Sequence, residues 1–194
     1  ESYMSYKLTM LFDGDDSLFK DVLKTSKIFG EYGCGSSTEW VLKNTNADIV
    51  SVDSSKVWIN KISSGNAAYK KRLKLKYIDL GEVENWGRPV GYEKSYNFIN
   101  YFNWIWNQDI LPDTVLIDGR FRVCCFLTSI KYANENTKII FDDYNNRPYY
   151  HVVEKFVKKE QTCGRQALFI VKNKNDINID LLNIEINNFH YVMD

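Results

Sequence analysis

The residues best suited to chemistry are acids placed where predicted strands end. Five apolar runs lead into carboxylates, at Glu31, Asp53, Asp79, Asp118 and the pair Asp142-Asp143. Ligands of open α/β sheets bind outside the carboxyl ends of the strands, so each acid is a candidate site residue. Carboxylates in such a place can hold sugar hydroxyls, bind a hard cation or take up a proton.

A glycine-rich turn follows the first of these acids. At Gly33 and Gly35 the missing Cβ lets backbone N–H groups approach a ligand closely. Ser36 and Glu39 have the spacing of a capping box, which predicts a helix that begins right after the turn and directs its positive end at the ligand. The next predicted strand ends at Asp53, whose carboxylate can accept both hydroxyls of a ribose. These features predict a pocket for a nucleoside cofactor.

The residue at position 38 indicates which nucleoside cofactor fits. The dinucleotide fingerprint G-x-G-x-x-G needs a third glycine beside the pyrophosphate, and this chain has Thr38 there. The carboxylate of Glu31 would also repel a pyrophosphate, whereas it suits a ligand with positive charge. The pattern therefore favours S-adenosylmethionine over NAD.

Further motifs, taken with the turn, resemble the class I S-adenosylmethionine-dependent methyltransferases. They are Val52-Asp53, Trp58, Trp86-Gly87-Arg88-Pro89, Ile117-Asp118-Gly119-Arg120 and Phe141-Asp142-Asp143-Tyr144. The resemblance extends over residues 17–172 and is nearest to small bacterial or viral members that methylate glycans or small molecules at oxygen. It implies a Rossmann-like α/β sandwich, with a mostly parallel seven-stranded sheet, an antiparallel C-terminal hairpin and helices on both faces.

The resemblance also implies roles for individual residues. It assigns the methionine part of the cofactor to Glu31 and the glycine turn, the ribose to Asp53, and the adenine to Asp79-Leu80. The residues expected to bind the cofactor are Glu31, Gly33, Cys34, Gly35, Ser36, Ser37, Asp53, Ser54, Asp79, Leu80 and Asp118.

The acids after the fourth and fifth strands are expected to lie close together, because these strands should be neighbours. Such carboxylates repel each other unless they are protonated or bound to a metal ion, and hard oxygen ligands favour Mg²⁺ or Ca²⁺. In O-methyltransferases that resemble this pattern, the metal lowers the pKa of the acceptor hydroxyl. Three interpretations stay open for Asp118, Asp142 and Asp143: a divalent-metal site, a metal-free general base, or structural capping of the adjoining loops.

Arginines after Asp118 depart from the metal-dependent pattern. An arginine here could replace the metal by pairing with Asp118, or could bind a phosphate or carboxylate of the acceptor. The aromatic segment 92–106 has helical spacing and is interpreted first as core, with an acceptor surface around Tyr92 and Trp86 as the alternative. The expected acceptor-binding residues are Arg120, Arg122, Tyr92 and Arg147.

Composition limits the class of function. A chain of 194 residues suits one domain over 1–194, with a core at 17–172 and a polar tail at 173–194. The 25 basic residues equal the 25 acidic ones, so no broad cationic field favours nucleic acid. No apolar stretch reaches the ~20 residues of a membrane span. The four cysteines lack C-x-x-C spacing, and a cytoplasmic location is expected.

Alternating strand and helix patterns must position the candidate residues. Strands are predicted, with helical spacing between the first five, at 28–32, 48–53, 73–80, 114–118, 138–142 and 166–172. A helix should precede the first strand, starting at Asp15 or Asp16, and another should cover 150–159 before a turn at 162–164. This alternation is typical of a parallel α/β sheet.

The leading hypothesis is an S-adenosylmethionine-dependent O-methyltransferase that acts on a small hydroxylated acceptor such as a sugar or glycan precursor, with divalent-metal assistance left open. One alternative is a noncatalytic binding or scaffold protein that kept the fold. The other is an NAD-dependent oxidoreductase. Neither nucleic acid nor membrane is expected as a partner, and the oligomeric state, a homodimer included, is left open.

Overall fold

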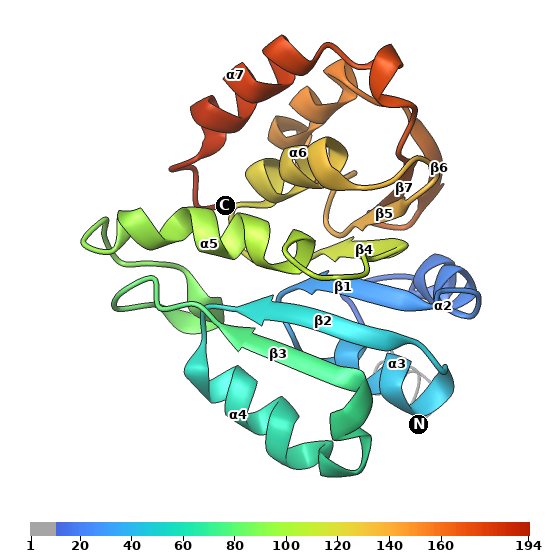
Figure 1. Cartoon of the computed structure of the whole chain (residues 1–194), viewed down its shortest axis with the longest axis vertical. Helices are drawn as coiled ribbons and strands as arrows, with labels where there is room; N and C mark the ends of the chain where they lie inside the picture. The colour runs from blue at the N-terminus through green and yellow to red at the C-terminus, as the bar shows by residue number, and fades with distance from the viewer. Residues whose placement is uncertain (1–10) are drawn as a thin grey trace.

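A seven-stranded sheet forms the centre of the computed structural model, which describes residues 11–194 (Figure 1). The strand order is β3-β2-β1-β4-β5-β7-β6. The first five strands in this order run parallel to one another, and β7 runs antiparallel to both β5 and β6. The predicted Rossmann-like sheet with its antiparallel C-terminal hairpin is therefore confirmed.

The helices and strands alternate along the chain through β5. The strands are β1 (Ile28–Tyr32), β2 (Asp48–Asp53), β3 (Leu73–Tyr77), β4 (Thr114–Ile117), β5 (Lys138–Phe141), β6 (Lys159–Cys163) and β7 (Gln166–Ile170). The α-helices are α2 (Ser17–Leu23), α3 (Ser36–Asn44), α4 (Lys56–Gly65), α5 (Phe98–Asn103), α6 (Arg122–Tyr132) and α7 (Ile179–Phe189). No helix within residues 11–194 is both long and apolar enough to cross a membrane.

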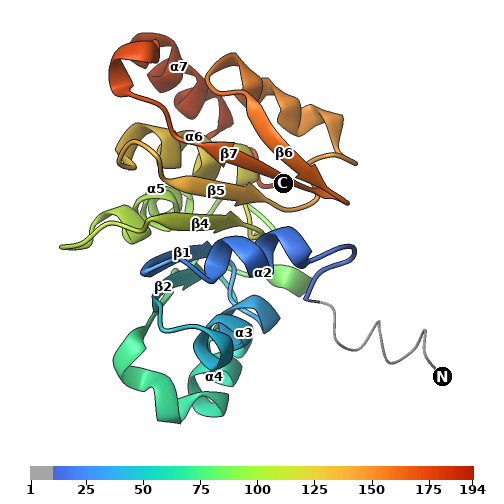
Figure 2. The ribbon, with the colours of Figure 1, turned by 90° about the vertical axis from the view of Figure 1, so that its right-hand side faces the viewer.

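Side chains on both faces of the sheet are covered by helices. In β4, Val115 and Ile117 face the cluster that includes α5, α6 and α7, whereas Leu116 faces the cluster formed with α2 and α3. Figure 2 shows these two helical layers on opposite sides of the sheet. Because both faces are buried, the central strands are apolar at most positions, as is usual for parallel sheets.

The C-terminal segment packs against the domain. Leu182 of α7 is fully buried, and Ile186 and Phe189 are partly buried against the same core as α6, whereas Ile184 is exposed. Beyond α7, the carbonyl oxygen of Met193 accepts a hydrogen bond from the Phe121 N–H at the start of α6. The polar tail therefore supplies one face of the core.

Several predicted elements differ from the structure. β3 ends at Tyr77, three residues before the predicted end. The helix predicted over 150–159 is a 3-10 helix at Pro148–Lys155, and β6 occupies part of the predicted turn, so the chain reverses at Gly164 with φ 57°. The segment 92–106 is not one helix, since 3-10 turns precede and follow α5. The strand β6 was missed because its residues are polar and mostly exposed, so no apolar alternation reveals it.

Candidate functional site

A cavity of about 960 Å³ lies at the carboxyl ends of the parallel strands. This is the edge at which open α/β sheets bind ligands. Its wall contains most of the predicted site residues: Gly33, Cys34, Gly35, Ser36, Ser37, Asp53, Ser54, Asp118, Arg120, Arg122, Asp142, Asp143 and Arg147. The topology thus brings together side chains that lie far apart in the sequence.

The two glycines of the turn after β1 have different reasons to be glycine. Gly33 has φ 92°, and a Cβ there would lie 3.0 Å from the Cα of Gly119. Gly33 therefore permits the ends of β1 and β4 to approach each other. A Cβ on Gly35, in contrast, would meet no protein atom within 4 Å. Gly35 borders open space in the cavity, where only a ligand would contact it.

The start of α3 is capped one residue earlier than predicted. Gly35 is the N-cap, and its N–H donates to Thr38 Oγ1 over 3.0 Å. The predicted capping box of Ser36 and Glu39 is wrong, because Glu39 instead pairs with Lys43 over 3.6 Å. The prediction that the helix begins directly after the turn is correct.

Asp53 links the glycine turn to the end of β2. Its Oδ2 accepts the Cys34 N–H over 2.9 Å, and its Oδ1 accepts the Ser55 N–H over 2.7 Å. Burial raises the pKa of Asp53, and the backbone hydrogen bonds oppose this rise. The carboxylate is thereby held rigidly at the cavity wall, with lone pairs left for ligand hydroxyls.

Two tryptophans form an aromatic surface beside Asp53. The rings of Trp58 and Trp86 stack with centroids 5.8 Å apart and planes 18° apart, and both line the cavity. Trp86 is 73% exposed and has φ 67°. Its loop is held by Ser54, whose hydroxyl donates to the Gly87 carbonyl oxygen over 2.6 Å. Sequence reasoning assigned neither ring to the cofactor, although exposed aromatic faces suit a nucleobase.

Glu31 does not line the cavity. It is completely buried and accepts hydrogen bonds from the hydroxyls of Ser37, Thr38 and Ser51, the last over 2.8 Å. Burial raises the pKa of Glu31 to about 7, against the opposing effect of these hydroxyls. Glu31 is therefore not placed to contact the methionine part of a cofactor, as was expected. It instead links β1 to β2 and α3 through these hydrogen bonds.

Three other predicted residues lie outside the cavity wall. Asp79 pairs with Lys94 and accepts the Gly81 N–H over 2.9 Å. Leu80 is buried in the core, and Tyr92 is exposed and packs on Tyr191. The early end of β3 accounts for the first two, since the chain has left the sheet before it reaches Asp79.

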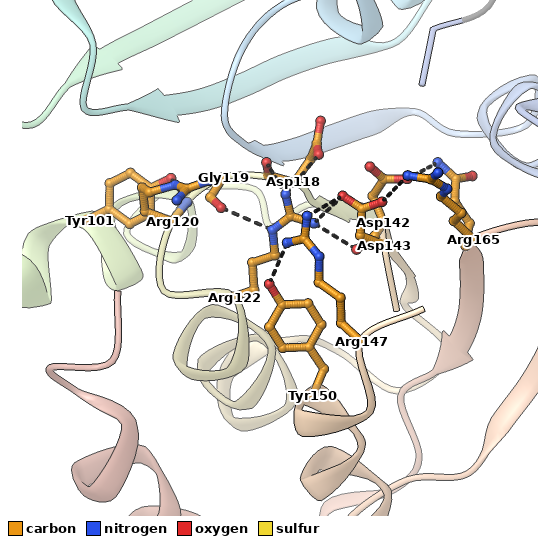
Figure 3. Close-up of polar contacts among 11 residues, drawn as sticks. Tyr101, Asp118, Gly119, Arg120, Arg122, Asp142, Asp143, Arg147, Tyr150 and Arg165 are labelled. Carbon is orange, nitrogen blue, oxygen red and sulfur yellow. Dashed lines mark hydrogen bonds and ion pairs between the residues drawn. The ribbon is translucent and has the colours of Figure 1, made fainter. Parts of the chain in front are cut away.

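Arg122 lies between the acids that follow β4 and β5 (Figure 3). Its guanidinium donates to the carbonyl oxygens of Gly119, Asp118 and Asp142 over 3.2, 3.2 and 2.8 Å. It also forms ion pairs with Asp118 at 3.4 Å and Asp143 at 3.5 Å, and its side chain is 5% exposed. Arg122 thus forms internal ion pairs, the first of the two roles that the sequence left open, and its donors are engaged within the protein.

Asp143 receives two further arginines. Its carboxylate lies 3.2 Å from Arg147 and 3.6 Å from Arg165. Neighbouring Asp142 accepts a hydrogen bond from the Gln166 side chain over 2.9 Å. Arg165 was not predicted, because it reaches Asp143 only through the β6–β7 turn, whose place depends on the unpredicted strand β6.

The donor set does not fit the divalent ion that the sequence suggested for Asp118, Asp142 and Asp143. Within residues 11–194, no group of three or more His, Cys, Asp or Glu side chains is arranged to hold a metal ion. Three guanidinium groups surround Asp143, and their positive charge would repel a cation there. The negative charge of Asp118 and Asp143, which the metal interpretation left to a cation, is compensated by arginine side chains.

The carboxyl group of Asp118 has a perturbed pKa. Desolvation raises the pKa of Asp118 well above its usual range, the Asp142 carboxylate raises it further, and Arg122 opposes both effects. Asp118 also lines the cavity. A cavity carboxyl with a raised pKa is a candidate proton acceptor.

Arg120 lies on the other side of Asp118 from the Asp143 cluster (Figure 3). Its backbone N–H donates to the hydroxyl of Tyr101 over 3.0 Å. Its Nε is buried and has no hydrogen-bond partner in the described part of the chain. Buried donors are nearly always satisfied, so an unpartnered Nε in a residue of the cavity wall is unusual. Tyr101 escaped sequence reasoning because it lies in a helix interpreted as core.

Solved structures of known proteins share this architecture. A methyltransferase-like protein from Silicibacter pomeroyi is 26% identical, with 96% of this chain and 97% of that chain covered and a TM-score of 0.82. The O-methyltransferase from Bacillus cereus, in complex with SAH, is 15% identical over 87% and 86% of the two chains, with a TM-score of 0.57. The O-methyltransferase TomG from Streptomyces achromogenes, in complex with SAM, is 11% identical over 80% and 77%, with a TM-score of 0.56.

No family model and no curated protein matches the chain. The assignment therefore rests on the fold: the strand order, the antiparallel C-terminal pair and the near-complete overlap with the Silicibacter pomeroyi structure. The chain therefore has the fold of the class I methyltransferases.

Proposed function

We propose that the protein is an S-adenosylmethionine-dependent methyltransferase that methylates a hydroxyl group of a small acceptor. The observation that carries this proposal is the open space beside Gly35. It lies in the same cavity as the carboxylate of Asp53 and the stacked rings of Trp58 and Trp86. Glycine backbone, a strand-end carboxylate and aromatic faces together suit a nucleoside.

The cavity residues offer complementary groups to each part of this cofactor. Asp53 would accept the ribose hydroxyls, and the ring of Trp58 or Trp86 would contact the adenine. Arg120, with its unpartnered Nε, would neutralise the carboxylate of the methionine part. When bound, the cofactor supplies a methyl group on a sulfonium.

Asp118 would take the proton of the acceptor hydroxyl. Methyl transfer from the cofactor to the acceptor oxygen would release the hydroxyl proton, and the Asp118 carboxylate in the cavity wall would accept it. The raised pKa makes this carboxylate a stronger base than an ordinary one. Arg122 keeps Asp118 in place through its ion pair. No step in this scheme requires a metal ion.

Calorimetric titration with S-adenosylhomocysteine tests the cofactor assignment through a matched pair of glycines. Gly35→Ala should weaken binding by about tenfold or more, because the new methyl group occupies cofactor space. Gly65→Ala, at the end of α4, is the control, since its Cβ also meets no atom within 4 Å but lies outside the cavity. Neither change should shift the melting temperature appreciably.

Two results would contradict this proposal. If Gly35→Ala and Gly65→Ala bind S-adenosylhomocysteine with equal affinity, the space beside Gly35 is not part of the cofactor site. If the unaltered protein binds neither S-adenosylmethionine nor S-adenosylhomocysteine, the methyltransferase assignment itself is wrong. If binding is found, transfer of labelled methyl groups to a panel of sugars and phenols identifies the acceptor class.

A further inference from the structure

We propose that Arg147 and Arg165, termed here the arginine pair, bind an anionic group of the acceptor, either a carboxylate or a phosphate. The term acceptor rests on the proposed function, whereas the anion site itself does not. Both guanidiniums line the cavity and meet at the carboxylate of Asp143. Figure 3 shows them approaching this carboxylate from different parts of the chain.

The arginine pair is positioned by hydrogen bonds between its two loops. Asn145 lies in the loop after β5 and donates through its side chain to the carbonyl oxygens of Gly164 and Gln166, each over 3.0 Å. Its backbone N–H donates to the Arg165 carbonyl oxygen over 3.1 Å. The β6–β7 turn is thereby tied to the loop that carries Arg147, so the two guanidiniums are fixed on one wall.

The arginines around Asp143 differ in how far they are exposed. Three guanidiniums share this carboxylate, and Arg122 is almost completely buried and engaged with backbone carbonyls. The side chains of Arg147 and Arg165 remain 35% and 49% exposed, compared with 13% for Asp143. At Asp143 itself the two guanidiniums are therefore more accessible than the carboxylate, which favours an anion there.

Donors are left over after the internal contacts are made. A guanidinium has five N–H donors. In the described part of the chain, Arg165 side-chain nitrogens contact only Asp143, and those of Arg147 contact Asp143 and the Tyr150 hydroxyl, the latter over 3.0 Å. Guanidiniums bind carboxylates and phosphates through paired N–H groups, which the arginine pair can still provide.

The arginine pair is distinct from the residue proposed for the cofactor carboxylate. Arg120 lies beside Tyr101, on the opposite side of Asp118 from Asp143 (Figure 3). Asp118, the proposed proton acceptor, lies between the two positive regions. An acceptor held by its anionic group at the arginine pair would thus lie on the side of Asp118 away from Arg120.

Nuclear magnetic resonance of the arginine Nε–H groups tests this site directly. The protein, saturated with S-adenosylhomocysteine, is titrated with sodium phosphate and separately with sodium benzoate, with sodium chloride holding the ionic strength constant. We expect saturable shifts of the Arg147 and Arg165 resonances. Arg165→Gln should weaken anion binding by about tenfold, the effect of losing hydrogen bonds to a charged group. The control Arg88→Gln, an exposed arginine outside the cavity wall, should behave like the unaltered protein.

The two titrations distinguish the sources of the anion. Tighter binding of phosphate indicates a phosphorylated acceptor, and tighter binding of benzoate indicates a carboxylic acid. The site is overturned if chloride gives the same shifts or if Arg165→Gln binds both anions as the unaltered protein does. It is also overturned if Arg165→Gln loses affinity for S-adenosylhomocysteine, because the arginine pair would then hold the cofactor carboxylate. Failure of S-adenosylhomocysteine to bind at all contradicts the proposed function; anion shifts at the pair in that sample would still support the anion site.

Discussion

At the scale of single residues, Glu31 shapes the cavity without lining it. Hydroxyls from α3 and β2 converge on its carboxyl group, which holds the start of α3 against β1. A buried carboxyl group retains its charge only if hydrogen bonds compensate for lost hydration. Three hydroxyls compensate in part, and the pKa of Glu31 rises from 4.5 to about 7.

This raised pKa predicts how stability depends on pH. The folded protein holds the Glu31 proton more tightly than the unfolded chain does. The stabilisation of the folded state by this proton is therefore complete below pH 4.5 and is lost as pH rises through about 7. The glutamine in Glu31→Gln cannot titrate. Between these pH values the free energy of unfolding of this variant should therefore fall less steeply with pH than that of the unaltered protein, and the two slopes should differ by up to ~1.4 kcal/mol per pH unit.

Urea unfolding at a series of pH values measures these slopes. Glu39→Gln is the matched control, because this glutamate lies in the same helix but near the surface, paired with Lys43. Asp53, Asp118 and Asp142 also have raised pKa values and remain in both variants, so a residual slope is expected. Parallel stability curves for Glu31→Gln and the unaltered protein would contradict the raised pKa.

At the scale of elements, Arg122 joins the ends of β4 and β5. It extends from the first residue of α6 and donates to backbone carbonyls after both strands. Removing one partner of a buried charge network leaves the other charges and carbonyls without compensation. The geometry of the acidic end of the cavity therefore depends on one side chain.

We expect Arg122→Met to lower the free energy of unfolding by about 3–5 kcal/mol, the usual cost of breaking a buried ion pair. Arg88→Met is the control, because Arg88 forms a surface pair with Asp194 at 3.7 Å, and its loss should cost less than ~1 kcal/mol. Denaturant titration of both variants provides the comparison. A cost for Arg122→Met as small as that of the control would show that the network does not stabilise these strand ends.

The elements differ in how well their sequence reveals them. The boundaries of β1 and β2 agree with prediction, because apolar runs lead directly into a turn or a carboxylate. The strand β6 was missed, since its polar residues are ordered by pairing with β7 and not by a pattern of their own. Arg165 was missed for the same reason, because it lies in the turn between β6 and β7. Glu31 was placed at the ligand because strand position does not show that hydroxyls from two other elements enclose it.

At the scale of the whole molecule, the cavity is lined by two parts of the chain, one proposed to bind the cofactor and the other to bind the acceptor. The proposed cofactor residues come from the first two-thirds, ending at Arg120, whereas Arg147 and Arg165 come from the last third. α7 completes the domain by covering α6, and residues after it contact the start of α6. The packing of this C-terminal helix therefore supports the helix that carries Arg122.

The α7 contact can be measured with two aliphatic residues of the same helix. Leu182→Ala should lower the free energy of unfolding by about 2–5 kcal/mol, because the side chain is fully buried. Ile184→Ala, at a position 55% exposed, should change it by less than ~0.5 kcal/mol. Thermal and urea denaturation should give the same order. Similar costs at both positions would mean that α7 does not dock through Leu182.

The stacked pair of Trp58 and Trp86 has an optical consequence. Tryptophan emission depends on the solvation and stacking of the indole, and this pair lines the cavity where the adenine is proposed to bind, with Trp86 largely in water. Occupation of the cavity would change the light that the protein emits, without any added label. Trp86→Phe should give a smaller change in emission, because only Trp58 would then remain at the cavity.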